Sequence, residues 1–130
     1  MLILTVRTDK PEAEVGLFED GQRLAYTTWA AHRQLAETVH QVIVDVLREN
    51  GKDLHDIEAI AVYQGPGSFT GLRIGLTVAN AMADGFRLPI VGVEGETWLP
   101  QALGRLQAGE NDVAVMPEYG AEVHITLPKR

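Results

Sequence analysis

The residues with the clearest capacity for chemistry lie in one glycine-rich stretch, Gly65–Gly75, which reads Gly-Pro-Gly-Ser-Phe-Thr-Gly-Leu-Arg-Ile-Gly. Its glycines permit close backbone approach, and Pro66 fixes a sharp turn between two of them. Ser68 or Thr70 can cap a following helix, whose free N–H groups could bind an anion such as phosphate. The spacing matches neither G-x-G-x-x-G nor G-x-x-x-x-G-K-[ST], and no Lys follows. The stretch therefore favours a structural turn, with a ligand cradle as the alternative.

The other candidates for chemistry in this chain are weaker. Ser68 lacks the G-x-S-x-G surroundings of a hydrolase nucleophile, so a helix cap is the favoured role for it. His32 and His40 are two helical turns apart and could share a metal only if a third element brought ligands between them. The chain has no cysteine, which excludes disulfides and thiolate chemistry. Three acidic residues are interpreted as solvated faces or caps rather than a general acid/base pair: Glu94, Glu96 and Glu110.

The glycine stretch is positioned by an ordered series of strands and helices. Apolar runs predict the strands, helical periodicity predicts the helices, and Gly51 marks the end of the first helix. The predicted strands are Leu2–Val6, Ala13–Phe18, Arg23–Trp29, Ile57–Tyr63, Pro89–Val93, Asn111–Met116 and Glu122–Leu127. The predicted helices are Arg33–Asn50, Leu72–Phe86 and Glu94–Gln107. This order predicts an α/β fold, with a mixed sheet flanked by helices and a C-terminal strand pair.

The first seven elements follow the order of the ribonuclease H-like fold. A nuclease of that fold needs carboxylates at the strand ends to hold divalent metals. Arg7 follows the first strand here and Gln64 follows the fourth. Neither side chain can hold such a metal, so the sequence predicts no nuclease activity.

Two of the predicted helices are apolar over a wider arc than one sheet can cover. On the second of them, Gly71, Gly75, Ala79 and Ala83 fall four residues apart and form a smooth strip where another helix could approach closely. We therefore expect an interface with a partner helix, against the alternative that both helices are buried in their own domain. The predicted interface residues are Leu35, Ala36, Val39, Ile43, Gly71, Leu72, Gly75, Leu76 and Ala79.

The composition is that of a single globular domain. The chain has 130 residues, of which 45% are hydrophobic and 22% charged. No apolar run approaches the roughly 20 residues that span a bilayer, and Met1–Val6 is too short for a signal sequence, so a cytoplasmic setting is expected. The formal net charge of −7 argues against direct binding to a nucleic acid backbone.

The glycine stretch resembles the signature of the TsaB (YeaZ) family. The opening strands up to Trp29, the run Ala31–Gln34 and the Leu-Pro-containing segment Arg87–Val93 are similar to the same family. The resemblance covers essentially the whole chain, up to the start of a second lobe that is missing. The signature loop comprises Gly65, Pro66, Gly67, Ser68, Phe69 and Thr70.

The resemblance implies one lobe of the actin-like ATPase (ASKHA) fold, over residues 1–110, with residues 111–130 as the remnant hairpin of a truncated second lobe. It implies a non-catalytic scaffold or activator subunit for N6-threonylcarbamoyladenosine (t6A) modification of tRNA, without catalytic residues, cofactor or metal. The implied partners are a TsaD-like paralogue, which pairs through first-lobe helices, and a TsaE-like ATPase. A homodimer is expected when the chain is alone, tRNA contact only through the complex, and no contact with a membrane.

The chain departs from the family pattern in three places. Val6-Arg7-Thr8-Asp9 stands where the family carries Ile-Asp-Thr-Ser, Pro117-Glu118-Tyr119 stands where it carries Asp-Ala-Arg, and the sequence ends at Arg130. A nucleotide site between two lobes is therefore not expected. Two other functions are kept as alternatives: a small phosphotransferase or hydrolase of the actin-like superfamily, and a self-associating structural module of the same fold.

Overall fold

The computed structural model describes residues 1–31 and 34–117 as one α/β unit. The strands are β1 (Leu2–Arg7), β2 (Glu12–Glu19), β3 (Gln22–Ala30), β4 (Ala59–Gly65) and β5 (Ile90–Glu94). The α-helices are α1 (Leu35–Glu49), α2 (Phe69–Phe86) and α3 (Trp98–Gln107), and a short 3-10 helix spans Leu54–Asp56. The first seven predicted elements are confirmed in kind and in order.

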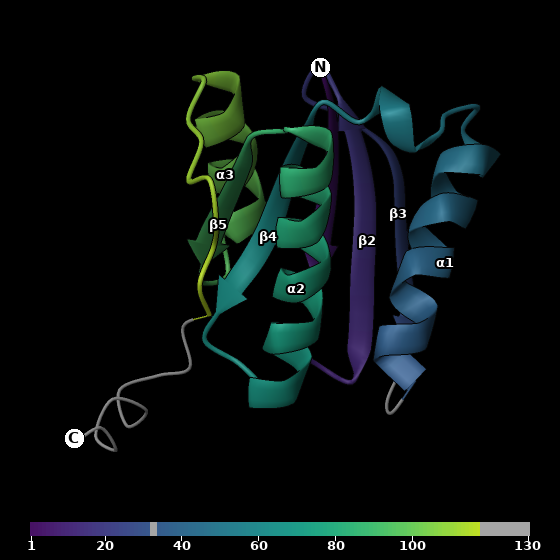
Figure 1. Cartoon of the computed structure of the whole chain (residues 1–130), viewed down its shortest axis with the longest axis vertical. Helices are drawn as coiled ribbons and strands as arrows, with labels where there is room; N and C mark the ends of the chain where they lie inside the picture. Colours follow the sequence, from purple (N-terminus) through teal and green to yellow (C-terminus); the bar gives the residue numbers. More distant parts are fainter. Residues whose placement is uncertain (32–33, 118–130) are drawn as a thin grey trace.

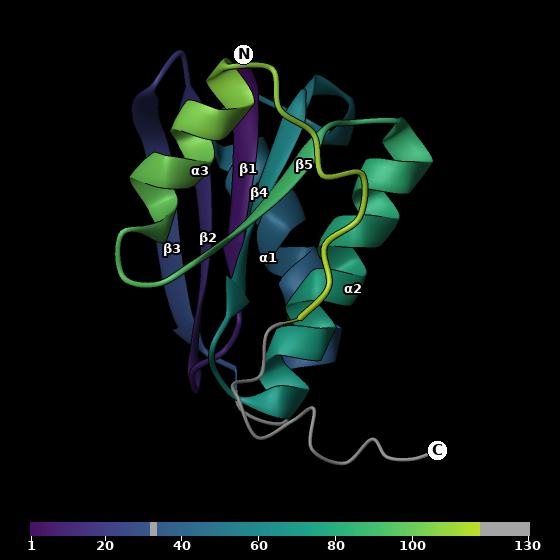
Figure 2. The ribbon, with the colours of Figure 1, turned by 90° about the vertical axis from the view of Figure 1, so that its left-hand side faces the viewer.

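The strands form one mixed sheet in the order β3-β2-β1-β4-β5. β1 pairs antiparallel with β2 and parallel with β4, so the hairpin half of the sheet meets the crossover half at β1. Helices α1 and α2 lie on one face of the sheet and α3 lies on the other (Figures 1 and 2). The carboxyl ends of β1 and β4 consequently reach the same end of the sheet as the start of α2.

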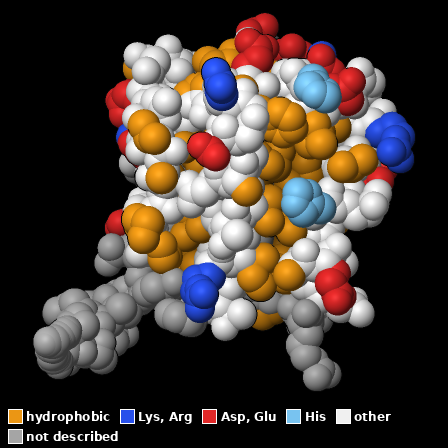
Figure 3. Space-filling model, in the orientation of Figure 1, with side chains coloured by type: hydrophobic (Ala, Val, Ile, Leu, Met, Phe, Trp, Pro, Cys, Tyr) orange, Lys and Arg blue, Asp and Glu red, His pale blue; other side chains and the backbone are white. Residues whose placement is uncertain are grey.

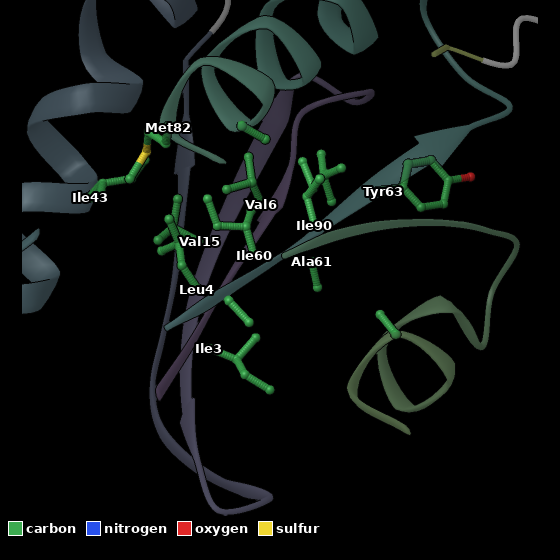
Figure 4. Packing of buried hydrophobic residues seen from close by; sticks show 14 of the residues in the cluster. Ile3, Leu4, Val6, Val15, Ile43, Ile60, Ala61, Tyr63, Met82 and Ile90 are labelled. Atoms are coloured by element: carbon green, nitrogen blue, oxygen red, sulfur yellow. The ribbon is translucent and has the colours of Figure 1, made fainter. Parts of the chain in front are cut away.

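The core is built from the alternating side chains of the sheet and the apolar stripes of the helices. Figure 4 shows Ile43 of α1 and Met82 of α2 pointing toward one another beside the sheet residues Val6, Val15 and Ile60. These sheet residues and Ile43 are fully buried. The β1 side chains from Leu2 to Val6 are buried on both faces of the sheet, so β1 lies at the centre of the core.

The helix boundaries differ from the predicted ones where caps decide them. Helix α2 begins at Phe69 rather than Leu72, since Ser68 is its N-cap and its hydroxyl accepts a hydrogen bond from the Gly71 N–H at 3.4 Å. Helix α3 begins at Trp98 rather than Glu94, because β5 extends through Glu94 and a turn follows. The predicted start of the first helix, Arg33, lies outside the described residues.

The predicted strand Asn111–Met116 is wrong. This segment has no regular structure and runs beside β5 and α2, where Asn111 and Asp112 hydrogen-bond to the β5 backbone through their side chains. Such short polar side chains compete with a backbone ladder. The second predicted strand, Glu122–Leu127, lies outside the described residues. Within residues 1–31 and 34–117, no helix is long and apolar enough to cross a membrane.

We expect Leu47→Ala to lower the free energy of unfolding by about 2–5 kcal/mol, because it empties a site in the core. Leu47 is 1% exposed, whereas Leu24 on β3 is 40% exposed. The matched change Leu24→Ala should therefore cost well under half as much. Urea denaturation of both variants measures this difference, and equal costs would contradict the assignment of the α1 stripe to the core.

Candidate functional site

The glycine stretch packs tightly against the turn that follows β1. A Cβ atom on Gly67 would overlap the Asp9 side chain, and one on Gly71 would overlap the Thr8 carbonyl. A Cβ on Gly75 would overlap the Thr8 hydroxyl, which donates a hydrogen bond to the Gly71 carbonyl at 2.7 Å. These glycines let the turn and the helix approach each other, which supports the structural interpretation of the stretch over a ligand cradle.

The entry into α2 is fixed by the backbone before the helix cap. The Gly65–Pro66 peptide bond is cis, and Gly65 has a φ of 132°, a conformation that favours glycine. The Tyr63 hydroxyl donates a hydrogen bond to the Pro66 carbonyl at 2.9 Å. Burial raises the pKa of Tyr63, which keeps this hydroxyl protonated as a donor. The loop is therefore held from β4 as well as from β1.

An ion pair occupies the end of β1, where the family resemblance implies the Asp of an Ile-Asp-Thr-Ser phosphate loop. The Arg7 guanidinium donates to the Asp9 carboxylate from Nε at 2.7 Å and from Nη2 at 3.3 Å. It also lies 3.8 Å from the centre of the Tyr63 ring, within cation–π range. Burial lowers the pKa of Arg7, but the hydrogen bond and charge of Asp9 more than offset this and raise it.

This arrangement does not fit a divalent cation with bound phosphates. Asp9 is only 8% exposed and its oxygens are already engaged by Arg7, so it is not available as a metal ligand. In the described part of the chain, no group of three or more His, Asp or Glu side chains could hold a metal ion. The charges of Arg7 and Asp9 at the end of β1 thus neutralise each other.

Most of the residues that were predicted to form the partner interface are buried inside the chain. Seven of them are buried in the chain's own core: Leu35, Val39, Ile43, Leu72, Gly75, Leu76 and Ala79. Gly71 lies against the Thr8 carbonyl, and only Ala36 is exposed. The small-residue strip of α2 therefore faces the chain itself, and the face assigned to a partner helix was wrong. An interface on these helices remains a prediction, but on a neighbouring face.

A groove between α1 and α2 presents that neighbouring face. The part that we call the α1–α2 groove is a hollow of about 270 Å³ lined by Ala36, Thr70, Arg73, Ile74, Thr77 and Val78. A second hollow, of about 300 Å³, adjoins it through Thr70 and Ile74 and reaches the Thr8–Asp9 turn. Figure 3 shows hydrophobic side chains gathered between the two helices.

Sequence periodicity missed this groove although its residues were visible. On α2 the groove residues lie at the border between the apolar arc and the polar stripe, so a helical projection alone does not assign them to either side. The spacing of the glycines could have identified these residues. Glycines mark the side of α2 that packs closely against the rest of the chain, and the groove residues lie beside it.

The chain is similar to proteins that are named for the modification of tRNA. The sequence model of the TsaD family, tRNA N6-adenosine threonylcarbamoyltransferase, matches residues 29–110. The tRNA threonylcarbamoyladenosine biosynthesis protein TsaB of Escherichia coli strain K12 is 33% identical over 129 residues, which cover 95% of this chain and 53% of that protein. The chain thus spans about half the length of the curated relatives that it matches.

Solved structures support the same relationship. YeaZ from Pseudomonas aeruginosa superposes with a TM-score of 0.69 at 30% identity, covering 82% of this chain and 50% of that one. RuvC of Thermus thermophilus, in complex with a Holliday junction substrate, gives a TM-score of 0.53 at 13% identity, covering 72% and 64%. The RuvC likeness concerns the fold alone. The predicted ribonuclease H-like, actin-like single lobe is confirmed.

The packing of α2 predicts opposite effects for two glycines of that helix. Gly75→Ala should lower the free energy of unfolding by about 1–3 kcal/mol, because the added methyl overpacks the site against Thr8. Gly85 has no atom within 4 Å of its Cβ position. Gly85→Ala should therefore raise stability by about 0.4–1 kcal/mol. Urea denaturation compares them, and a harmless Gly75→Ala would mean that the strip is an outer surface.

The Arg7–Asp9 pair predicts that the isolated chain binds ATP weakly or not at all. We also expect no ATPase, kinase or peptidase activity, because the phosphate position is filled by a cation that is already paired. Isothermal calorimetry with ATP and magnesium measures the binding. A dissociation constant in the low micromolar range without a partner protein would contradict the expectation.

Proposed function

Because the chain belongs to the TsaB (YeaZ) family, we propose that it is a non-catalytic subunit in the synthesis of N6-threonylcarbamoyladenosine in tRNA. The observation that carries this proposal is the Arg7–Asp9 ion pair at the end of β1, where the family resemblance implies the Asp of a phosphate-binding loop. A subunit of this kind contributes a binding surface rather than chemistry. The formal net charge of −7 fits tRNA contact through another subunit.

The proposed partner is a TsaD-like paralogue, and the proposed contact surface is the α1–α2 groove. An apolar groove between two helices accepts the apolar face of a further helix. The TsaD family model matches residues 29–110, a span that includes both groove helices. A paralogue would therefore carry equivalent helices, and the two pairs could pack as one helical bundle.

Two further associations follow from the same proposal. A TsaE-like ATPase would join the pair and supply the nucleotide chemistry that the Arg7 site of this chain does not fit. Without a paralogue, two copies of the chain would cover their grooves by forming a symmetric dimer, since one patch meets itself across a two-fold axis. The self-associating module that remains as an alternative function would use this dimer alone.

The groove proposal predicts that Ala36→Glu and Thr77→Glu abolish capture of a TsaD-like paralogue. Both residues are exposed and line the groove from opposite walls, so a buried carboxylate there opposes binding while the fold is kept. We expect at least tenfold weaker capture, a loss of t6A formation in the reconstituted system, and a melting temperature within a few degrees of the unaltered chain.

The matched control is Gln101→Glu, an exposed position on α3 at the opposite face of the sheet. It should leave capture, modification and melting temperature unchanged. Light scattering of the same variants tests the homodimer, which the groove substitutions should also dissociate. Normal capture by both groove variants would reject the surface, and normal t6A formation without capture would reject the function.

A further inference from the structure

The outer edge of β5 is closed by side chains and loop rather than by a strand. We propose that residues 111–116, here called the latch, occupy this edge in place of a sixth strand, and that releasing the latch opens the edge to β5 of a second copy of the chain. This inference concerns a surface apart from the α1–α2 groove. It does not depend on the proposed function.

The backbone groups at this edge can be accounted for one by one. The inner side of β5 pairs with β4 in parallel register. On the outer side, the Ile90 N–H donates to Asn111 Oδ1 at 3.1 Å, and the Ile90 carbonyl accepts from the Asp112 N–H at 2.7 Å. The Gly92 N–H donates to Asp112 Oδ2 at 3.0 Å, and the Gly92 carbonyl accepts from Arg105 Nη1 at 3.1 Å.

Arg105 of α3 joins the latch to the outer edge of β5. Its Nη2 donates to Asp112 Oδ1 at 2.6 Å while its Nη1 reaches Gly92, so one guanidinium serves both the strand and the latch. Nε of the same side chain pairs with Glu110 at 2.6 Å. A charged fork of this kind fixes the geometry as well as contributing energy. The latch and Arg105 therefore satisfy the backbone groups of β5 that a neighbouring strand would otherwise satisfy.

The latch is also fastened to α2 and β4. The Asn80 side chain of α2 donates to the Val115 carbonyl at 2.9 Å and accepts from the Val115 N–H at 2.8 Å, as a neighbouring strand would do. The Val115 side chain occupies the space that a Cβ on Gly92 would need. Gln64, in β4, donates to the Met116 carbonyl at 2.7 Å.

The latch carries backbone strain that its fastenings oppose. Val113 has a φ of 69°, which is costly for a β-branched residue, and its side chain is 74% exposed. Strain of this kind persists only where the surrounding contacts over-determine it. Removing the contacts on either side of Val113 therefore favours an open latch.

A second copy fits the opened edge because β5 is self-complementary. Its sequence, Ile-Val-Gly-Val-Glu, has three β-branched strand formers around a central glycine and a single charge at the end. The outward N–H and carbonyl of Gly92, at the centre of the strand, can exchange two hydrogen bonds with Gly92 of another copy across a two-fold axis. Long apolar edges associate in this way unless something covers them.

The test is the double variant Asn111→Ala/Asp112→Ala, which removes the side-chain acceptors of Ile90 and Gly92. Amide exchange at these two residues should accelerate about tenfold or more, and light scattering should show twice the mass of the chain that carries Thr77→Glu alone. The matched control, Gln41→Ala/Asp45→Ala, removes an exposed amide and carboxylate that hydrogen-bond to each other on α1. It should change neither reading. All four measurements carry Thr77→Glu, which excludes association through the groove.

A reversible tether keeps the proposal testable if the open variant loses stability. The Val115 side chain adjoins the Cβ position of residue 92, so Gly92→Cys/Val115→Cys is the pair chosen for an engineered disulfide in this cysteine-free chain, with loss of free thiols confirming the bond. Added to the double variant, the oxidised tether should restore the mass of the Thr77→Glu chain, and reduction should double that mass again. Unchanged exchange at Ile90 and Gly92 would reject the latch. The same mass in both redox states would reject pairing through β5.

Discussion

The contact between the Thr8–Asp9 turn and the glycine face of α2 is the constraint on which the rest of the structure depends. It fixes how closely α2 lies to the end of β1 and which side of the helix faces the sheet. Because side chains on α2 follow the helical period, that one choice also decides which residues line the groove with α1. The signature glycines set how closely α2 packs against the Thr8–Asp9 turn. In this way they also decide which α2 side chains are exposed at the groove.

The turn that makes this contact is also held by an ion pair at the end of β1. Arg7 and Asp9 neutralise each other beside the Tyr63 ring, and the Tyr63 hydroxyl holds the start of the glycine loop. Charges that hydrogen-bond so closely stabilise the turn instead of attracting a ligand. The Thr8–Asp9 turn and the glycine loop therefore act as a rigid support for the start of α2.

Local signals in the sequence were sufficient for the five strands of the sheet and for the choice of Ser68 or Thr70 as the helix cap, because alternation, turn glycines and capping residues act over a few positions. They were insufficient for the strip at Gly75 and Ala79. Helical periodicity shows that these residues share a face, but the partner of that face is Thr8, far away in the sequence. The prediction of a strand at Asn111–Met116 was wrong for a related reason. Its apolar residues suggested a strand, while its two polar residues supply the hydrogen bonds that a strand would have formed.

The order in which the latch and β5 occur along the chain has a consequence for synthesis on the ribosome. β5 emerges first, then α3 with Arg105, and only afterwards Asn111 and Asp112. At roughly 5–20 residues per second, the outer edge of β5 stays uncovered for on the order of seconds. During that interval, neighbouring nascent chains on one message present identical open edges to each other.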